Sequence, residues 1–128
     1  MNPNNKIIAV YGSLREGMGN HGLISHSQMV ERRIVRLPYK MISLGSFPGL
    51  ITDEKLNDIV IELYEVDQPT YARVERLEGY PNFYDKYAFL LPEYEFPVEI
   101  YVLNQKDERG SYKSEGEHIQ DWVKYKMR

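Results

Sequence analysis

The chain has no cysteine among its 128 residues. This absence excludes disulfide bonds, thiolate nucleophiles and metal sites built on cysteine. An excess of positive charge is missing as well, because 16 Lys and Arg residues stand against 19 Asp and Glu residues. Nucleic-acid-binding domains usually carry a basic surface, so a formal net charge of −3 argues against such a partner.

Long hydrophobic runs are also absent. The first apolar run covers only residues 7–10, whereas a membrane-spanning helix needs about 20 apolar residues. The polar residues 1–5 do not resemble a signal peptide. We therefore expect a cytoplasmic protein without a membrane partner. The three histidines lack the spacing of a zinc motif, so no metal site is expected.

Strand patterns dominate the chain. The first apolar run and its flanks predict a buried central strand at residues 6–12. Further strands are predicted at residues 28–37, 39–44, 58–66, 83–91 and 96–103. Asp67 as N-cap and Gly79 as stop signal predict a helix that reaches Glu78. A second helix is expected at residues 118–127.

Turn and loop signals separate these elements. Pro38 is expected to end the strand before it. The glycines and proline of residues 45–49 predict a turn. The polar residues 104–117 are expected to form a loop, which is a candidate lid over a binding pocket. Many strands with one or two helices predict an α+β fold. We expect a small, mixed, β-barrel-like sheet with packed helices, in a single domain over residues 1–128.

The break after the first strand is a candidate binding loop. Gly12 lets the chain turn tightly beside a ligand. Exposed N–H groups at Gly12, Ser13 and Leu14 are suited to hold a carboxylate or a phosphate. Arg15 is expected to add a positive charge at the mouth of this site. The alternative is a structural turn followed by a solvated arginine.

Three better-known motifs fit this region only in part. Residues 17–22 match the dinucleotide pattern G-x-G-x-x-G, but they lie five residues past the strand and no crossover helix follows. Residues 12–17 have the spacing of a phosphate loop, but Met18 and Gly19 replace the required Lys and Ser/Thr. Ser13 lacks the G-x-S-x-G surroundings of a hydrolase nucleophile. All three interpretations are rejected.

The carboxylate at the helix end is the candidate proton carrier. Glu78 lies in the last turn, where the helix dipole disfavours negative charge, and it shares the apolar face with Val74. This placement should raise its pKa toward neutrality, as a general acid/base requires. The alternative is an exposed glutamate paired with Arg73 or Lys86. Glu75 points away from Val74 and is expected to be solvated.

Four separate segments of the chain carry a family resemblance. They are the loop Tyr11-Gly12-Ser13-Leu14-Arg15 with Gly17 and Asn20-His21, the turn at residues 45–49, the stretch from Val74 to Tyr80, and the pair Phe83-Tyr84. Together they resemble the gamma-glutamylcyclotransferase-like (AIG2-like) superfamily over residues 6–103. Two positions depart from the family pattern, because Glu75 stands where the family has Asp and Lys86 stands where it has Arg.

The resemblance implies a small mixed barrel with a pocket between the glycine loop and the glutamate. It implies that Glu78 is the catalytic acid/base and that Tyr11, Gly12, Ser13 and Leu14 bind the substrate. Arg15 and Tyr84 are further candidates for substrate contact, although core packing is the simpler role for a tyrosine at position 84.

The reaction implied by the resemblance is an intramolecular acyl transfer. The substrate's own α-amine attacks its γ-glutamyl amide carbon, which releases 5-oxoproline and a free amine. This chemistry needs neither metal nor cofactor. The partner is then a small γ-glutamyl amine or peptide, and we expect a monomer or a weak homodimer. The alternative is a non-catalytic module that uses the same loop to bind a small ligand or a partner chain.

Overall fold

The computed structural model describes residues 2–104 and 119–126. Their elements, in chain order, are β1 (Lys6–Val10), the 3₁₀ turn η1 (His21–Leu23), β2 (Gln28–Ser43), β3 (Pro48–Val66), α1 (Gln68–Glu78), β4 (Tyr84–Phe89), β5 (Val98–Leu103), β6 (Ile119–Gln120) and α2 (Trp122–Lys126).

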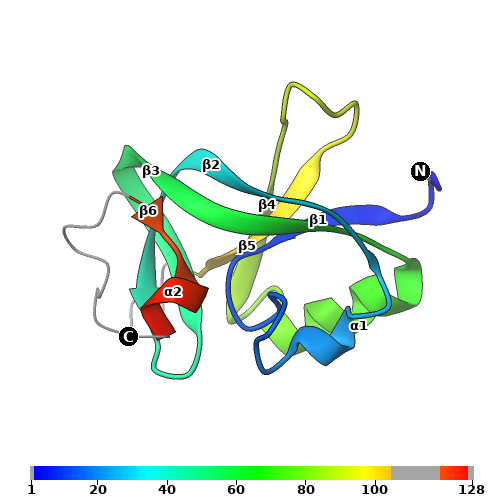
Figure 1. Ribbon diagram of the computed structural model, residues 1–128, viewed down its shortest axis with the longest axis horizontal. Coiled ribbons are helices and arrows are strands. Elements are labelled where there is room, and N and C mark those ends of the chain that lie inside the picture. The colour runs from blue at the N-terminus through cyan, green and yellow to red at the C-terminus, as the bar shows by residue number, and fades with distance from the viewer. Residues whose placement is uncertain (1, 105–118, 127–128) are drawn as a thin grey trace.

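The strands form one mixed sheet in the order β2-β3-β1-β5-β4, with β6 paired to β3 off this path (Figure 1). The β1–β5 and β3–β6 pairs are parallel, and the other pairs are antiparallel. The order runs from β2 to β4 without joining these two strands, so the described sheet is open. A mixed sheet with few helices confirms the predicted α+β class.

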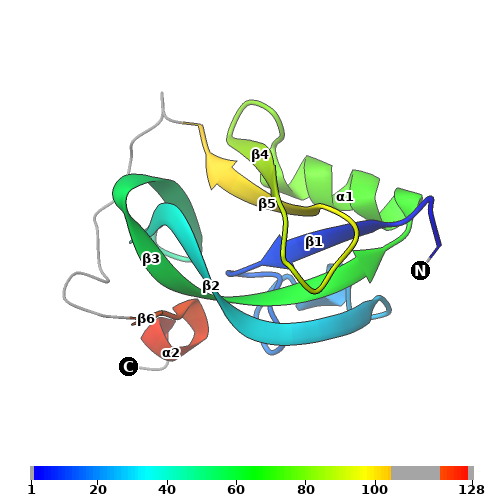
Figure 2. The ribbon, with the colours of Figure 1, turned by 90° about the horizontal axis from the view of Figure 1, so that it is seen from above.

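Both faces of the sheet are buried around β1. Ile7 and Ala9 pack into one apolar cluster, together with Trp122 of α2. Ile8 and Val10 pack into the other, together with residues of α1. The two helices lie at opposite ends of the molecule, as both views show (Figures 1 and 2). The predicted buried central strand is therefore confirmed, although it ends at Val10 and not at residue 12.

The β2–β3 hairpin is longer than the sequence indicates. The prediction that Pro38 ends a strand is wrong, because β2 continues through it to Ser43. The register against β3 shifts between Leu37 and Tyr39. A proline without an N–H is tolerated at such an irregularity on an edge strand. The partner strand, expected over residues 58–66, begins at Pro48.

Helix α1 has the boundaries that its caps predict. The side chain of Asp67 accepts a hydrogen bond from the Thr70 N–H at 2.9 Å. Gly79 ends the helix with φ at +63°, a left-handed conformation that favours glycine. Its N–H donates to the Arg76 carbonyl oxygen at 3.1 Å. Glu78 is thereby fixed as the last helical residue.

The remaining predicted elements shift by a few residues. Strands β4 and β5 begin and end inside the predicted ranges. The predicted terminal helix is divided, since residues 119–120 form β6 before α2 starts at Trp122. Apart from Asn104, the predicted loop at residues 104–117 lies outside the described residues, as do residues 118 and 127. Among the described helices, none has the length and apolar character to cross a membrane.

Replacing Trp122 with alanine tests the attachment of α2. The side chain is 1% exposed within the first cluster. Loss of so large a buried side chain should lower the free energy of unfolding by about 3–5 kcal/mol. Urea unfolding followed by circular dichroism measures the change. Lys124→Ala on the exposed side of the same helix is the control and should change the value by less than about 0.5 kcal/mol. Equal effects of the two substitutions would contradict this packing.

Candidate active site

The first three residues of the loop after β1 differ in how their carbonyl and N–H groups are used. Each carbonyl oxygen accepts a hydrogen bond from further along the loop: Gly12 from the Arg15 N–H (3.0 Å), Ser13 from the Asn20 N–H (2.9 Å) and Leu14 from ring Nδ1 of His21 (2.9 Å). Within residues 2–104 and 119–126, the N–H groups of Gly12, Ser13 and Leu14 have no acceptor. Such a row of free donors suits an anion.

Gly12 allows the close packing that shapes this loop. A Cβ atom at this position would lie 2.6 Å from ring carbons of Pro48. The lack of room beside β3 thus explains the glycine at position 12, whereas the sequence analysis expected a tight turn beside a ligand.

Glu78 faces the same loop from the end of α1. Its half-buried side chain lines a cavity. None of the described residues donates a hydrogen bond to the carboxylate or pairs a charge with it. Burial raises the pKa of Glu78 to about 7. A carboxyl group with this pKa exchanges protons readily near neutral pH.

The cavity has a volume of about 350 Å³. This size is typical of a small-molecule site. Its lining brings together six of the seven predicted site residues, namely Tyr11, Gly12, Ser13, Leu14, Glu78 and Tyr84. Other lining side chains include Asn20, Phe47, Leu77, Phe83 and Tyr101. Glu78 is the one charged side chain among the described lining residues.

The chain also matches a known protein family. The model of the family described as "Gamma-glutamyl cyclotransferase, AIG2-like" matches residues 8–124. The chain belongs to this family. The resemblance found in the sequence is thereby confirmed.

Two curated relatives in this family match part of the chain. A protein of Methanocaldococcus jannaschii named "Putative gamma-glutamylcyclotransferase" is 37% identical over 78 residues, which is 60% of this chain and 64% of that protein. The "Gamma-L-glutamyl-butirosin B gamma-glutamyl cyclotransferase" of Niallia circulans is 33% identical over 72 residues, which is 56% of this chain and 44% of that protein. The chain thus matches less than two thirds of either relative's length.

The fold also has solved relatives. The crystal structure of an uncharacterized protein from Pyrococcus horikoshii matches with a TM-score of 0.74 and 20% identity, over 95% of this chain and 93% of that one. At this identity the match shows a shared AIG2-like fold.

Two tyrosines that line the cavity donate their hydroxyl protons to backbone carbonyl groups of the protein. Tyr11 donates to the Tyr101 carbonyl oxygen at 2.7 Å, and Tyr84 donates to the Pro48 carbonyl oxygen at 2.6 Å. Burial, with the nearby Glu78 carboxylate, raises the pKa of both hydroxyls above the ordinary value. They therefore stay protonated and brace the cavity walls.

Tyr101 is a site residue that the sequence analysis missed. Its hydroxyl is buried and has no hydrogen-bond partner in the described part of the chain. Burial, followed by the charge of Glu75, raises its pKa above the ordinary value. The alternation of β5 places Tyr101 on the opposite face from Ile100, but the sequence does not say which face α1 covers. Without that knowledge, the sequence does not distinguish Tyr101 from the other tyrosines in predicted strands.

The structure corrects the expected place of Arg15. Its side chain is 4% exposed and does not line the cavity. The guanidinium instead donates to Glu62 at 2.9 Å and to Asp121 at 2.8 Å. A buried arginine needs such partners, and they come from distant parts of the chain.

The alternative pairing of Glu78 is also absent. Lys86 lies 3.0 Å from the carboxylate of Glu75, and Arg73 donates to Thr70. Glu75 is therefore half-buried and paired, which corrects the expectation of a solvated side chain. In the described residues, no group of three or more His, Asp and Glu side chains is arranged to hold a metal ion.

Gly12→Ala should destabilise the protein. The new Cβ would meet Pro48 at 2.6 Å, and overpacking of this kind costs about 1–3 kcal/mol. Gly19→Ala is the matched control in the same loop, because its Cβ would meet nothing within 4 Å. Urea unfolding of both variants measures the difference. A Gly12→Ala variant as stable as Gly19→Ala would contradict the close approach.

Glu78→Gln should stabilise the protein in a pH-dependent way. The pKa of Glu78 rises on folding from 4.5 to about 7. The raised pKa therefore adds its full contribution to the free energy of unfolding below pH 4.5, and this contribution is lost as the pH rises through about 7. Glutamine does not titrate, so the variant should gain about 1–3 kcal/mol over wild type at pH 8 relative to pH 4. Urea unfolding at the two pH values tests this, and a gain independent of pH would contradict it.

Proposed function

We propose that the protein is a gamma-glutamyl cyclotransferase that converts a γ-glutamyl amine or peptide into 5-oxoproline and a free amine. Glu78 is the acid/base of this reaction. One observation carries the proposal. Among the described residues, the Glu78 carboxylate, with a pKa of about 7, and the N–H groups of Gly12, Ser13 and Leu14 have no hydrogen-bond partner, and these four residues line one cavity. The names of the curated relatives support the same chemistry.

The nucleophile of the reaction belongs to the substrate. Its α-amine is tethered to the γ-carbonyl carbon that it attacks, so correct orientation supplies much of the acceleration. The cavity has to hold the glutamyl chain in a bent conformation that brings these two atoms together. Apolar walls such as Phe47 and Phe83 exclude water around that chain.

Glu78 moves the protons. As a carboxylate it accepts a proton from the α-ammonium group, and the freed amine attacks the γ-carbon. As a carboxylic acid it then donates that proton to the leaving nitrogen, and the C–N bond breaks. A second proton passes from the ring nitrogen in the same direction, so the products are a neutral lactam and an ammonium ion. A pKa near 7 suits both roles.

The free N–H groups supply positive potential without a charged side chain. Gly12, Ser13 and Leu14 either hold the α-carboxylate of the substrate or stabilise the oxyanion that develops on the γ-carbonyl oxygen. Tyr101 also lines the cavity, and its buried hydroxyl has no hydrogen-bond partner among the described residues.

Glu78→Gln should lower kcat by about 10²- to 10⁴-fold, because loss of a general acid/base has this effect. Release of 5-oxoproline is measured by mass spectrometry on γ-glutamyl dipeptides, γ-glutamyl amines and glutathione. In the wild type, kcat/KM should fall as the pH drops below about 7. Glu75→Gln is the matched control one turn earlier on α1, outside the cavity lining, and should retain activity.

Two results would contradict the proposal. A folded Glu78→Gln variant with wild-type kcat would remove Glu78 from the reaction. Tight binding of a γ-glutamyl compound without turnover, unchanged in this variant, would identify a binding module instead.

A further inference from the structure

Glu62 is a buried carboxylate that the proposed reaction does not use. It lies on β3 opposite Val10, the last residue of β1. Its side chain has no exposed surface. It does not line the cavity. It nevertheless lies where the loop after β1 begins. A buried charge in such a position needs an explanation, because it costs free energy unless its partners are well placed.

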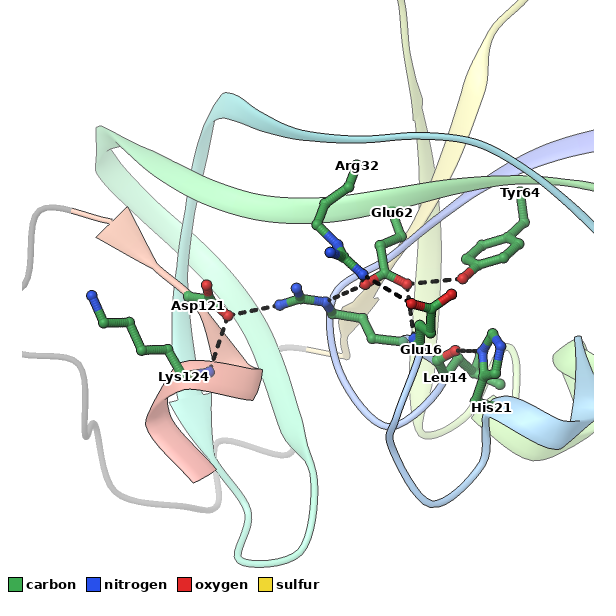
Figure 3. A network of polar contacts seen from close by, with 9 residues as sticks. Leu14, Glu16, His21, Arg32, Glu62, Tyr64, Asp121 and Lys124 are labelled. Atoms are coloured by element: carbon green, nitrogen blue, oxygen red, sulfur yellow. Dashed lines mark hydrogen bonds and ion pairs between the residues drawn. The ribbon is translucent and has the colours of Figure 1, made fainter. Parts of the chain in front are cut away.

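Both carboxylate oxygens of Glu62 are fully occupied. Oε2 accepts from Nε of Arg15 at 2.9 Å and from Nε of Arg32 at 3.0 Å. Oε1 accepts from the Glu16 N–H and from the Tyr64 hydroxyl, both at 2.9 Å. Figure 3 shows the side chains of Arg32 and Tyr64 meeting at Glu62. Burial acts to raise its pKa, but the donors Glu16, Arg15 and Tyr64 together hold the pKa of Glu62 below its ordinary value.

These donors hold the end of the loop segment that lines the cavity. Arg15 and Glu16 directly follow Leu14, so two bonds to one rigid carboxylate fix the direction in which the chain leaves the loop. Glu62 is also connected to the loop through the aromatic rings of Tyr64 and His21. Tyr64 packs against His21 with their ring centroids 5.8 Å apart, and His21 is bonded to the Leu14 carbonyl oxygen at 2.9 Å.

The same network reaches the C-terminal segment. Asp121 lies between β6 and α2 and accepts from Arg15 Nη1 at 2.8 Å. It also accepts from the Lys124 N–H at 3.2 Å, within α2 (Figure 3). Burial acts to raise the pKa of Asp121, but the Arg15 guanidinium and the Lys124 N–H hold it below its ordinary value. Arg15 is thus clamped between carboxylates from two distant segments.

We infer that Glu62 is a positioning residue for the substrate: through Arg15, Glu16 and Tyr64 it orients the free N–H groups of Gly12, Ser13 and Leu14. This inference rests on the proposed function for its effect on turnover, but not for its effect on the loop. Donors that bind a carboxylate or an oxyanion must be aligned closely, and a misplacement of about 1 Å costs on the order of 100-fold in rate. Arg15 was expected to contact the substrate. It instead binds Glu62, outside the cavity lining, and so helps to fix the loop.

The test replaces Glu62 with glutamine, which keeps the shape and removes the charge and half of the acceptor capacity. In the protein without ligand, the ¹H–¹⁵N resonances of Gly12, Ser13 and Leu14 should move. The Kd for the probe 5-oxoproline and the KM of turnover should rise about 10-fold or more. The pH midpoint of kcat, which Glu78 sets, should stay where it is in wild type.

The control is Glu93→Gln, which breaks the exposed ion pair with Arg33 at 3.1 Å and should leave every one of these quantities unchanged. If Glu62→Gln does not fold, Tyr64→Phe removes one donor and keeps the ring against His21. It should move the same three resonances and raise the Kd in the same sense.

A folded variant with wild-type loop resonances and wild-type Kd would overturn the inference. A pH midpoint that moves while the Kd stays constant would also overturn it, because the effect would then act on Glu78. Failure of the proposed function is a separate result. In that case the wild type releases no 5-oxoproline from any substrate, while the resonances of the free protein still test the role of Glu62.

Discussion

The site depends on the way in which the chain leaves β1. Gly12 turns so close to Pro48 that a side chain has no room, and the carbonyl groups that follow are bonded within the loop. Three consecutive N–H groups are left without an acceptor in the described part of the chain. Unpaired backbone donors are costly inside a protein, so this turn is stable only where solvent or a ligand reaches it. The cavity beside Glu78 provides that access.

Two glutamates in this fold have opposite environments. Burial acts to raise the pKa of each, but only Glu62 has donors that outweigh it and keep its pKa low. Glu78 has no such donor among the described residues, and its pKa rises to about 7. A buried carboxylate without a partner costs stability, and groups with such raised pKa values cluster at functional sites. This difference fits the two proposed roles, in which Glu62 holds the loop and Glu78 carries a proton.

The sequence predicted features that depend on neighbouring residues and missed those that depend on distant ones. Helix α1 and the place of Glu78 at its end follow from local caps. Arg15 was misplaced because its partners Glu62 and Asp121 lie 47 and 106 residues away. The course of β2 through Pro38 is set by its pairing with β3, which no local pattern reveals.

We propose that Glu78 carries protons beside three N–H groups that, like its own carboxylate, have no hydrogen-bond partner among the described residues. The most direct test is a ¹³C NMR titration of its side-chain carboxyl group in the wild-type protein. We expect a midpoint near pH 7, well above that of an ordinary glutamate. A midpoint at pH 4.5 or below would show a solvated or paired carboxylate, and it would contradict the role given to this site.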